Sequence, residues 1–170
     1  MQRDGTLHCM TTDELSDEPL TLTELAAQED ELQLERFDND DAWALGVALV
    51  EEARRRELPV VIDIHRAGQQ LFHAAMPGGA IDNDIWIARK ARTVTRFGHS
   101  SLYMRTLCDD AGTTLDEKFE LSLEQYAAAG GAFPLTVRHV GSVGVVTVSG
   151  LPHVQDHRLV VMVLAEFIRG

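Results

Sequence analysis

The feature that most constrains the fold is a pair of strand-like runs that occurs twice, with a long helical region between the two pairs. Residues 59–66 and 69–75 are rich in apolar and β-branched residues and flank an Ala-Gly pair, which predicts a hairpin. Residues 134–139 and 143–149 are rich in valine and threonine and predict a second hairpin. Since hairpins join antiparallel neighbours, the chain is expected to build an antiparallel sheet with helices packed on it.

Helix signals fill the rest of the chain. Thr21 and Glu24 form a capping-box pattern, and Gly98 and Gly112 are typical helix ends. The predicted helices span residues 22–31, 42–56, 81–97, 102–110, 115–129 (clearest over 122–129) and a last segment opened by Leu151 and Pro152. Residues 32–37 alternate apolar and polar and predict one more strand. This order predicts an α+β fold, a profilin-like or PAS-like antiparallel sheet of about five strands flanked by helices.

The first hairpin also predicts which side chains share a face. With a two-residue turn, cross-strand partners lie on the same side of the sheet. The apolar face would then hold Val60, Ile62, Ile64, Leu71, His73 and Ala75, and the other face would hold Asp63, His65, Gln70 and Phe72. On that second face Asp63 and His65 are either an acid–base pair or, as is commoner, simply solvated side chains. Gly144 inside the second hairpin indicates a close approach of another backbone or of a ligand.

Charge is distributed unevenly. The net charge is −12, of which residues 1–38 carry −9 and residues 39–170 only −3. Residues 1–20 are therefore expected to form a disordered acidic arm before a single domain over residues 21–170. Cys9 and Cys108 show no motif spacing, which indicates a reducing compartment. We expect a cytoplasmic protein without a membrane span, because no stretch approaches the length and apolarity of one.

One helix stands out against this acidic background. Arg89, Lys90, Arg92 and Arg96 lie on the segment 81–97, where clustered cations either clamp a small anion or pair with the acidic arm. The cluster is too short, and too poor in interleaved aromatic residues, to predict nucleic-acid binding. The candidate caps at the start of this helix are Asp82, Asn83 and Asp84.

Two histidine motifs contain residue types that can carry chemistry. Gly98-His99-Ser100-Ser101 lacks the second glycine of a nucleophile elbow, so a helix cap is the expected role of its serines. His153 and His157 stand four residues apart on a predicted helix, where both can reach a metal or a haem iron. Asp156 either orients such a histidine or caps the helix.

Six blocks of the sequence together resemble the GlcG/HbpS-like haem-degrading domain family, in its uncharacterised cytosolic branch. The blocks are residues 58–64, 68–73, 82–90, 96–101, 130–134 and 144–157. The resemblance extends over roughly residues 22–164, and the blocks occur in the family's order. It implies a profilin-like α+β fold, a homo-oligomer and, for some relatives, haem or tetrapyrrole binding with haem breakdown proposed.

The resemblance implies a site residue only at positions where this sequence has the same residue as the family. The candidate ligand-binding residues are Asp82, Asn83, Trp86, Arg89, Lys90, Arg96, His99 and Ser100, and the candidate metal-binding residues are His153, Asp156 and His157. Ala129 stands where relatives often have a histidine before the paired glycines. No catalytic residue is implied.

Two functional hypotheses follow. In the first, an oligomer binds a small anionic ligand such as haem: Arg89, Lys90 and Arg96 hold carboxylates, and His99 or His157 faces the iron. In the second, the protein is a non-catalytic assembly or adaptor module whose basic helix forms salt bridges between subunits and whose apolar last helix is buried in the oligomer. A metal-dependent enzyme is a third reading, supported only by the two histidines of the last helix.

Overall fold

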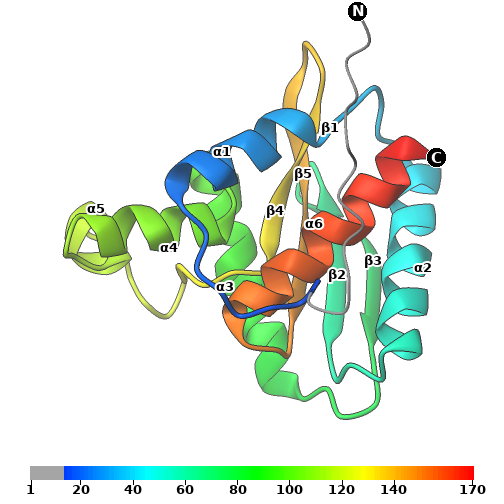
Figure 1. The fold of residues 1–170 in the computed structure, drawn as a ribbon, viewed down its shortest axis with the longest axis horizontal. Helices are drawn as coiled ribbons and strands as arrows, with labels where there is room; N and C mark the ends of the chain where they lie inside the picture. Colours follow the sequence, from blue (N-terminus) through cyan, green and yellow to red (C-terminus); the bar gives the residue numbers. More distant parts are fainter. Residues whose placement is uncertain (1–13) are drawn as a thin grey trace, which may run out of the picture.

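The computed structural model describes residues 14–170, so Cys9 and most of the predicted disordered arm lie outside the described residues. Five strands form one sheet in the order β1-β4-β5-β2-β3 (Figure 1). The strands are β1 (Gln33–Leu34), β2 (Val61–Arg66), β3 (Gln69–Ala75), β4 (Ala132–Val137) and β5 (Gly141–Ser149). Both predicted hairpins are confirmed, whereas the short β1 pairs with β4 in parallel, which makes the sheet mixed.

Helices cover both faces of this sheet. They are α1 (Leu22–Glu31), α2 (Asn39–Arg55), α3 (Ile81–Phe97), α4 (Ser101–Asp110), α5 (Leu115–Phe119) and α6 (His153–Arg169). α2 and α6 lie side by side on one face, α3 crosses the other face, and α1 and α4 pack together beyond the β4 side (Figure 1). The α+β architecture with flanking helices is therefore as predicted. None of the helices in residues 14–170 is both long and apolar enough to cross a membrane.

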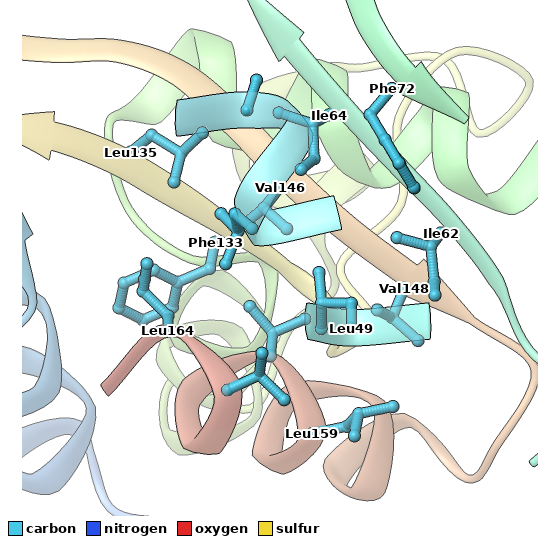
Figure 2. Close-up of a cluster of buried hydrophobic side chains, with 14 of the residues drawn as sticks. Leu49, Ile62, Ile64, Phe72, Phe133, Leu135, Val146, Val148, Leu159 and Leu164 are labelled. Carbon is cyan, nitrogen blue, oxygen red and sulfur yellow. The ribbon is translucent and has the colours of Figure 1, made fainter. Parts of the chain in front are cut away.

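The two faces of the sheet differ in character. On the face under α2 and α6, side chains such as Ile62, Val146 and Val148 join Leu49 and Leu159 in one large apolar core (Figure 2). The face under α3 holds a much smaller apolar cluster, Val94, Ala132 and Val145. Its buried residues also include Asp63, Thr147 and Ser149. Because burying polar groups costs free energy unless they are paired, the α3 face is where a function is to be sought.

The predicted faces of the first hairpin hold for β2 but were wrong for β3 beyond Gln70, because the two strands pair through a bulge. Their register shifts between Ile64 and His65, so that Ile64 pairs with Phe72 and Asp63 pairs with His73. A slip of one residue moves every side chain of a strand to the opposite face. Phe72 therefore enters the main core, and His73 comes to lie beside Asp63.

The predicted helix over residues 115–129 was wrong in its second half. α5 ends at Phe119, and residues 122–129 form a turn and an extended segment. The Thr93 hydroxyl of α3 donates to the Ala127 carbonyl at 3.0 Å and accepts from the Ala127 N–H at 3.2 Å. These tertiary bonds satisfy a backbone that would otherwise have its partners within a helix.

The caps of α3 also differ from the prediction. The N-cap is Ala80, whose N–H donates to the side-chain oxygen of Asn83 at 2.8 Å. Asp82 instead accepts from the indole N–H of Trp86 at 3.1 Å. At the other end Gly98 takes the left-handed conformation that the sequence predicted, with φ 72°.

Candidate functional site

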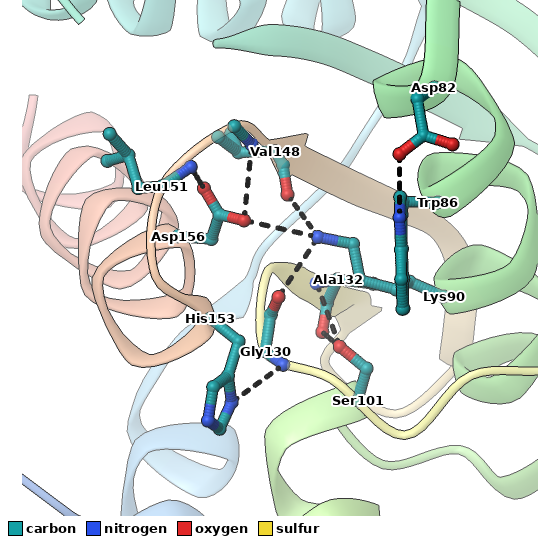
Figure 3. A network of polar contacts seen from close by, with 11 residues as sticks. Asp82, Trp86, Lys90, Ser101, Gly130, Ala132, Val148, Leu151, His153 and Asp156 are labelled. Carbon is teal, nitrogen blue, oxygen red and sulfur yellow. Dashed lines mark hydrogen bonds and ion pairs between the residues drawn. The ribbon is translucent and has the colours of Figure 1, made fainter. Parts of the chain in front are cut away.

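Lys90, one of the four predicted cations, is buried beneath α3 rather than exposed on it. Its Nζ donates to the carbonyls of Gly130 and Val148, at 3.0 and 2.7 Å, and lies 3.3 Å from the carboxylate of Asp156 (Figure 3). An ammonium group has three donors, and here all three have acceptors. Asp156 also accepts from the backbone N–H of Leu151 at 3.0 Å. Lys90 thus joins α3 to β5 and α6 and is fully engaged by the protein's own groups.

Burial opposes the charge of both members of this pair. It lowers the pKa of Lys90, against the favourable charge of Asp156. It raises the pKa of Asp156 to about 6, although Lys90 and the backbone donors lower it. A Cβ at Gly131 would lie 2.6 Å from Lys90 Nζ, so the glycine leaves room for the lysine.

A polar cleft of about 380 Å³ lies over this network, and we call it the α3–α6 cleft. It is lined by Asp82, Asn83, Trp86, Lys90, Arg105, Ala129, Gly130, Ser149, Gly150, Leu151, His153 and Asp156. The structure therefore brings together six of the eleven candidate site residues, and adds Arg105, for which the sequence gave no signal. His153 Nδ1 accepts from the Gly130 N–H at 3.4 Å, and burial lowers the His153 pKa, so its ring is neutral at pH 7.

The other three cations of α3 have no carboxylate partner in residues 14–170. The Arg89 guanidinium lies 4.5 Å from the ring centroid of Trp86, and that of Arg96 lies 5.6 Å from the Tyr126 ring. Arg92 donates to the carbonyl of Gln125 at 3.3 Å. These three arginines therefore form no ion pair with an acidic residue of the described part of the chain.

His99 and Ser100 do not line the α3–α6 cleft and lie against α1. His99 Nδ1 and the Ser100 N–H each lie 2.7 Å from the carboxylate of Glu29, and the His99 ring stacks on Tyr103. The Ser100 hydroxyl accepts from the Tyr103 N–H at 3.1 Å, which is the predicted helix cap of α4. In this arrangement both residues hold α4 to α1.

His157 is fully buried, and its Nε2 lies 2.8 Å from the side-chain oxygen of Gln28. Burial lowers its pKa to about 3, so it is neutral across the physiological range. It does not line the α3–α6 cleft. Within residues 14–170, no group of three or more His, Cys, Asp or Glu side chains is placed to hold a metal ion by itself.

A second and larger cleft, of about 580 Å³, lies between α3 and the two hairpin turns, and we call it the α3–β5 cleft. Its walls are mostly small or apolar: Ala67, Gly68, Ala88, Ala91, Val143, Gly144 and Val145. Its polar lining residues are His65, Arg92, Thr95 and Ser142. Large, mostly apolar clefts with a few convergent polar groups are the usual sites for small molecules.

Behind His65 lies a buried carboxylate. Asp63, 1% exposed, has Oδ2 at 2.5 Å from His65 Nδ1. Its Oδ1 accepts from Gln70 Nε2 at 2.6 Å and lies 3.2 Å from His73 Nδ1. The sequence showed Asp63 and His65 on one face, but the bulge that brings His73 to the buried Asp63 has no clear sequence signal. The usable signal was an aspartate inside a run of valine and isoleucine.

Comparisons with known proteins identify relatives over most of the chain. A family model described as haem degrading protein HbpS-like matches residues 37–165. A UPF0303 protein of Streptomyces coelicolor is 61% identical, with 87% of this chain and 94% of that protein covered. A UPF0303 protein of Streptomyces avermitilis is 55% identical, with 88% and 92% covered.

Solved structures show the same fold. The crystal structure of the Ybr137w protein aligns with a TM-score of 0.82 at 36% identity, covering 89% of this chain and 90% of that one. A PduOC–haem complex aligns with a TM-score of 0.64 at 22% identity, covering 76% of this chain and 93% of that one. The second likeness concerns the fold alone.

Proposed function

The chain belongs to the HbpS-like haem-degrading family, and on that premise we propose that it is a cytoplasmic homo-oligomer that binds a small anionic ligand along α3, namely haem or a related tetrapyrrole. The haem in the PduOC structure supports this class of ligand. Binding along α3 is supported by the two clefts, since residues of α3 line both of them.

One observation carries the proposal: Arg89, Arg92 and Arg96 have no carboxylate partner in the described part of the chain. A guanidinium group presents several donors in a plane and binds carboxylates in a bidentate manner. Haem carries two carboxylates on an apolar ring. Arg92 lines the α3–β5 cleft, and Arg89 and Arg96 lie on the same helix outside both clefts, so Arg92 is the one best placed to bind such a carboxylate.

The residues present also fit the rest of a haem molecule. Each cleft is lined by one imidazole, His65 or His153, and iron binds neutral imidazole. The α3–β5 cleft offers small and apolar walls, whereas the α3–α6 cleft offers the indole of Trp86. When bound, haem supplies an iron centre for redox or oxygen chemistry, and the chain's residues bind, orient and shield it.

Titration of the full chain with hemin tests the proposal. We expect a Soret shift that saturates. Replacing Arg89, Arg92 and Arg96 together by Gln is expected to weaken binding at least about tenfold, since each charge-assisted bond contributes about 1.5–3 kcal/mol.

A matched control replaces three exposed arginines on other segments, Arg36, Arg138 and Arg169, by Gln. This control changes the net charge by the same amount and is expected to bind hemin like the wild type. Equal weakening in both triple variants would mean that only overall charge matters, and no Soret change in the wild type would refute haem binding.

The same arginines support a second candidate, an assembly module. The outer side of α3 exposes Ile81 and Ile85, which are 82% and 53% exposed, in addition to Arg96 and the half-buried Arg89. A neighbouring copy with carboxylates would satisfy such a surface. Arg96→Glu discriminates between the candidates in light scattering and hemin titration. Loss of the oligomer with hemin binding retained favours assembly, and the converse favours the ligand.

A further inference from the structure

Among the described residues, six histidines are candidates for binding an iron: His65, His73, His99, His139, His153 and His157. Three do not suit the role. His157 is fully buried against Gln28, and His99, whose Nδ1 lies against Glu29, lines neither cleft. His73 has a carboxylate at each ring nitrogen, Asp63 at 3.2 Å and Asp84 at 3.3 Å, and a histidine with both nitrogens at carboxylates has no free lone pair to offer.

The remaining three differ in surroundings. His139 lies on the exposed β4–β5 turn and lines neither cleft. His153 lines the smaller and more polar cleft, and its Nδ1 accepts from a backbone N–H, so the proton of its neutral ring is on Nε2. His65 alone combines a position in the large apolar cleft with an Nδ1 directed at a carboxylate.

The buried Asp63 gives His65 the arrangement of a metal ligand. Metal-binding histidines generally donate their second N–H to a carboxylate or carbonyl, which fixes the tautomer and raises the basicity of the ring. Asp63 Oδ1 is held by Gln70 and His73, which leaves Oδ2 for His65. For stability alone, an apolar residue would serve better in the middle of β2, because a buried carboxylate is costly even when paired.

The cleft around His65 suits a flat apolar ligand with peripheral carboxylates. Ala88 and Ala91 present one wall from α3, and Gly68 presents the other, with open space where its side chain would be. Arg92 lies at the same cleft and uses one of its five N–H groups on Gln125, so that the others are free for a carboxylate.

From this geometry we propose that the α3–β5 cleft is the haem site and that Nε2 of His65 is the iron ligand. Asp63 positions the ring, and Arg92 holds a carboxylate of the porphyrin. This inference rests on the proposed function and adds to it the cleft, the iron ligand and the positioning residue.

The test compares His65→Ala with the wild type in hemin titrations of the full chain. We expect the Soret maximum of the variant complex to differ from that of the wild type and the affinity to fall about tenfold or more. Added free imidazole is expected to restore the wild-type spectrum, because it replaces the missing ligand. His139→Asn, at a histidine outside both clefts, is the matched control and is expected to behave like the wild type.

Two further variants separate ligation from folding. Asp63→Asn keeps the shape but weakens the acceptor, so resonance Raman is expected to show a lower iron–histidine stretching frequency while binding persists. Ala88→Trp leaves His65 in place and fills the cleft, so hemin binding is expected to be lost although the melting temperature of the apo chain stays within a few degrees.

The outcomes tell the two proposals apart. A wild-type chain without any Soret change overturns haem binding, and this site with it. A wild-type chain that binds hemin, together with a His65→Ala spectrum identical to it, overturns this site alone. Unimpaired binding by Ala88→Trp would do the same.

Discussion

At the scale of single residues, the unusual feature is the number of charged groups buried beneath α3. Lys90, Asp63 and Asp156 are each at most 2% exposed. Each has hydrogen-bonding partners within the chain: those of Lys90 and Asp156 come from more than one element, and those of Asp63, Gln70 and His73, both come from β3. The Lys90–Asp156 network and the contacts of Asp63 have different roles. Lys90 and Asp156 connect elements of the chain to one another, whereas Asp63 supports a histidine that faces a cleft.

Replacing Lys90 by Met is expected to lower the free energy of unfolding by about 3–5 kcal/mol, because it leaves the buried Asp156 carboxylate without its counter-charge and two carbonyls without the ammonium donor. Urea unfolding followed by circular dichroism measures the change. The double variant Lys90→Met with Asp156→Leu is expected to regain part of the loss. A single variant as stable as the wild type would show that the pair contributes little.

His157 predicts a pH dependence of stability. Its pKa is lowered to about 3 in the folded chain, by burial first and by Arg158 and His153 to a lesser extent, against an ordinary value of 6.5. Between pH 6.5 and pH 3, His157 is protonated in the unfolded state but not in the folded state. The free energy of unfolding therefore falls as the pH falls through this range. The contribution amounts to about 2–3 kcal/mol between pH 7 and pH 4.5.

His157→Gln, which does not titrate, isolates this contribution in urea unfolding at pH 7.0, 5.5 and 4.5. The stability of the variant is expected to depend less on pH. Asp156 acts in the opposite direction, since its pKa is raised to about 6 by burial, and it is present in both chains. Parallel pH profiles for the two proteins would contradict the assignment.

At the scale of elements, local signals predicted most helices and strands, because caps, glycines and periodicity act within a few residues. The capping box at Thr21 and Glu24 and the left-handed Gly98 lie where the sequence placed them. The failures have tertiary causes. The bulge between β2 and β3 reversed a predicted face, and Thr93 of α3 holds residues 122–129 out of a helix.

In the candidate site, too, local features could be predicted from the sequence and tertiary contacts could not. The basic character of α3 could be read from the sequence, and Trp86 and Asn83 do line a cleft. That Lys90 is buried could not be read, because its acceptors come from β5, α6 and the residues before β4. The role of His65 depends on a cleft formed by elements far apart in the chain, which local patterns do not report.

Gly144 is expected to be sensitive to substitution. A Cβ at this position would lie 2.2 Å from the carbonyl oxygen of His65 and 3.3 Å from the Cα of Arg66, so the close backbone approach predicted for this glycine is confirmed. Gly144→Ala is expected to destabilise the protein by about 1–3 kcal/mol, as overpacking generally does. Chemical unfolding measures it, with the neighbouring exposed Ser142→Ala as a control that should change stability little.

At the scale of the whole molecule, one side of the sheet supplies stability and the other holds the candidate binding site. The α2–α6 side contains the large apolar core and so supplies most of the stability. The α3 side holds the α3–α6 and α3–β5 clefts, the buried charges and the three arginines that have no carboxylate partner within residues 14–170, in a chain of net charge −12. A basic helix on an acidic protein attracts anions locally, against the repulsion of the overall negative charge.

Residues 14–20 belong to the folded body by their contacts, although the sequence assigned them to the acidic arm. Glu14 pairs with Arg56, the Glu18 carbonyl accepts from Arg158, and Leu15 and Leu20 pack against the apolar clusters. A chain that begins at Thr21 is therefore expected to be about 2–4 kcal/mol less stable than one that begins at Met10, because two partly buried leucines lose their contacts. Thermal and urea unfolding of the two chains measure the difference. Equal stabilities would mean that these contacts contribute nothing and that the domain does begin at residue 21.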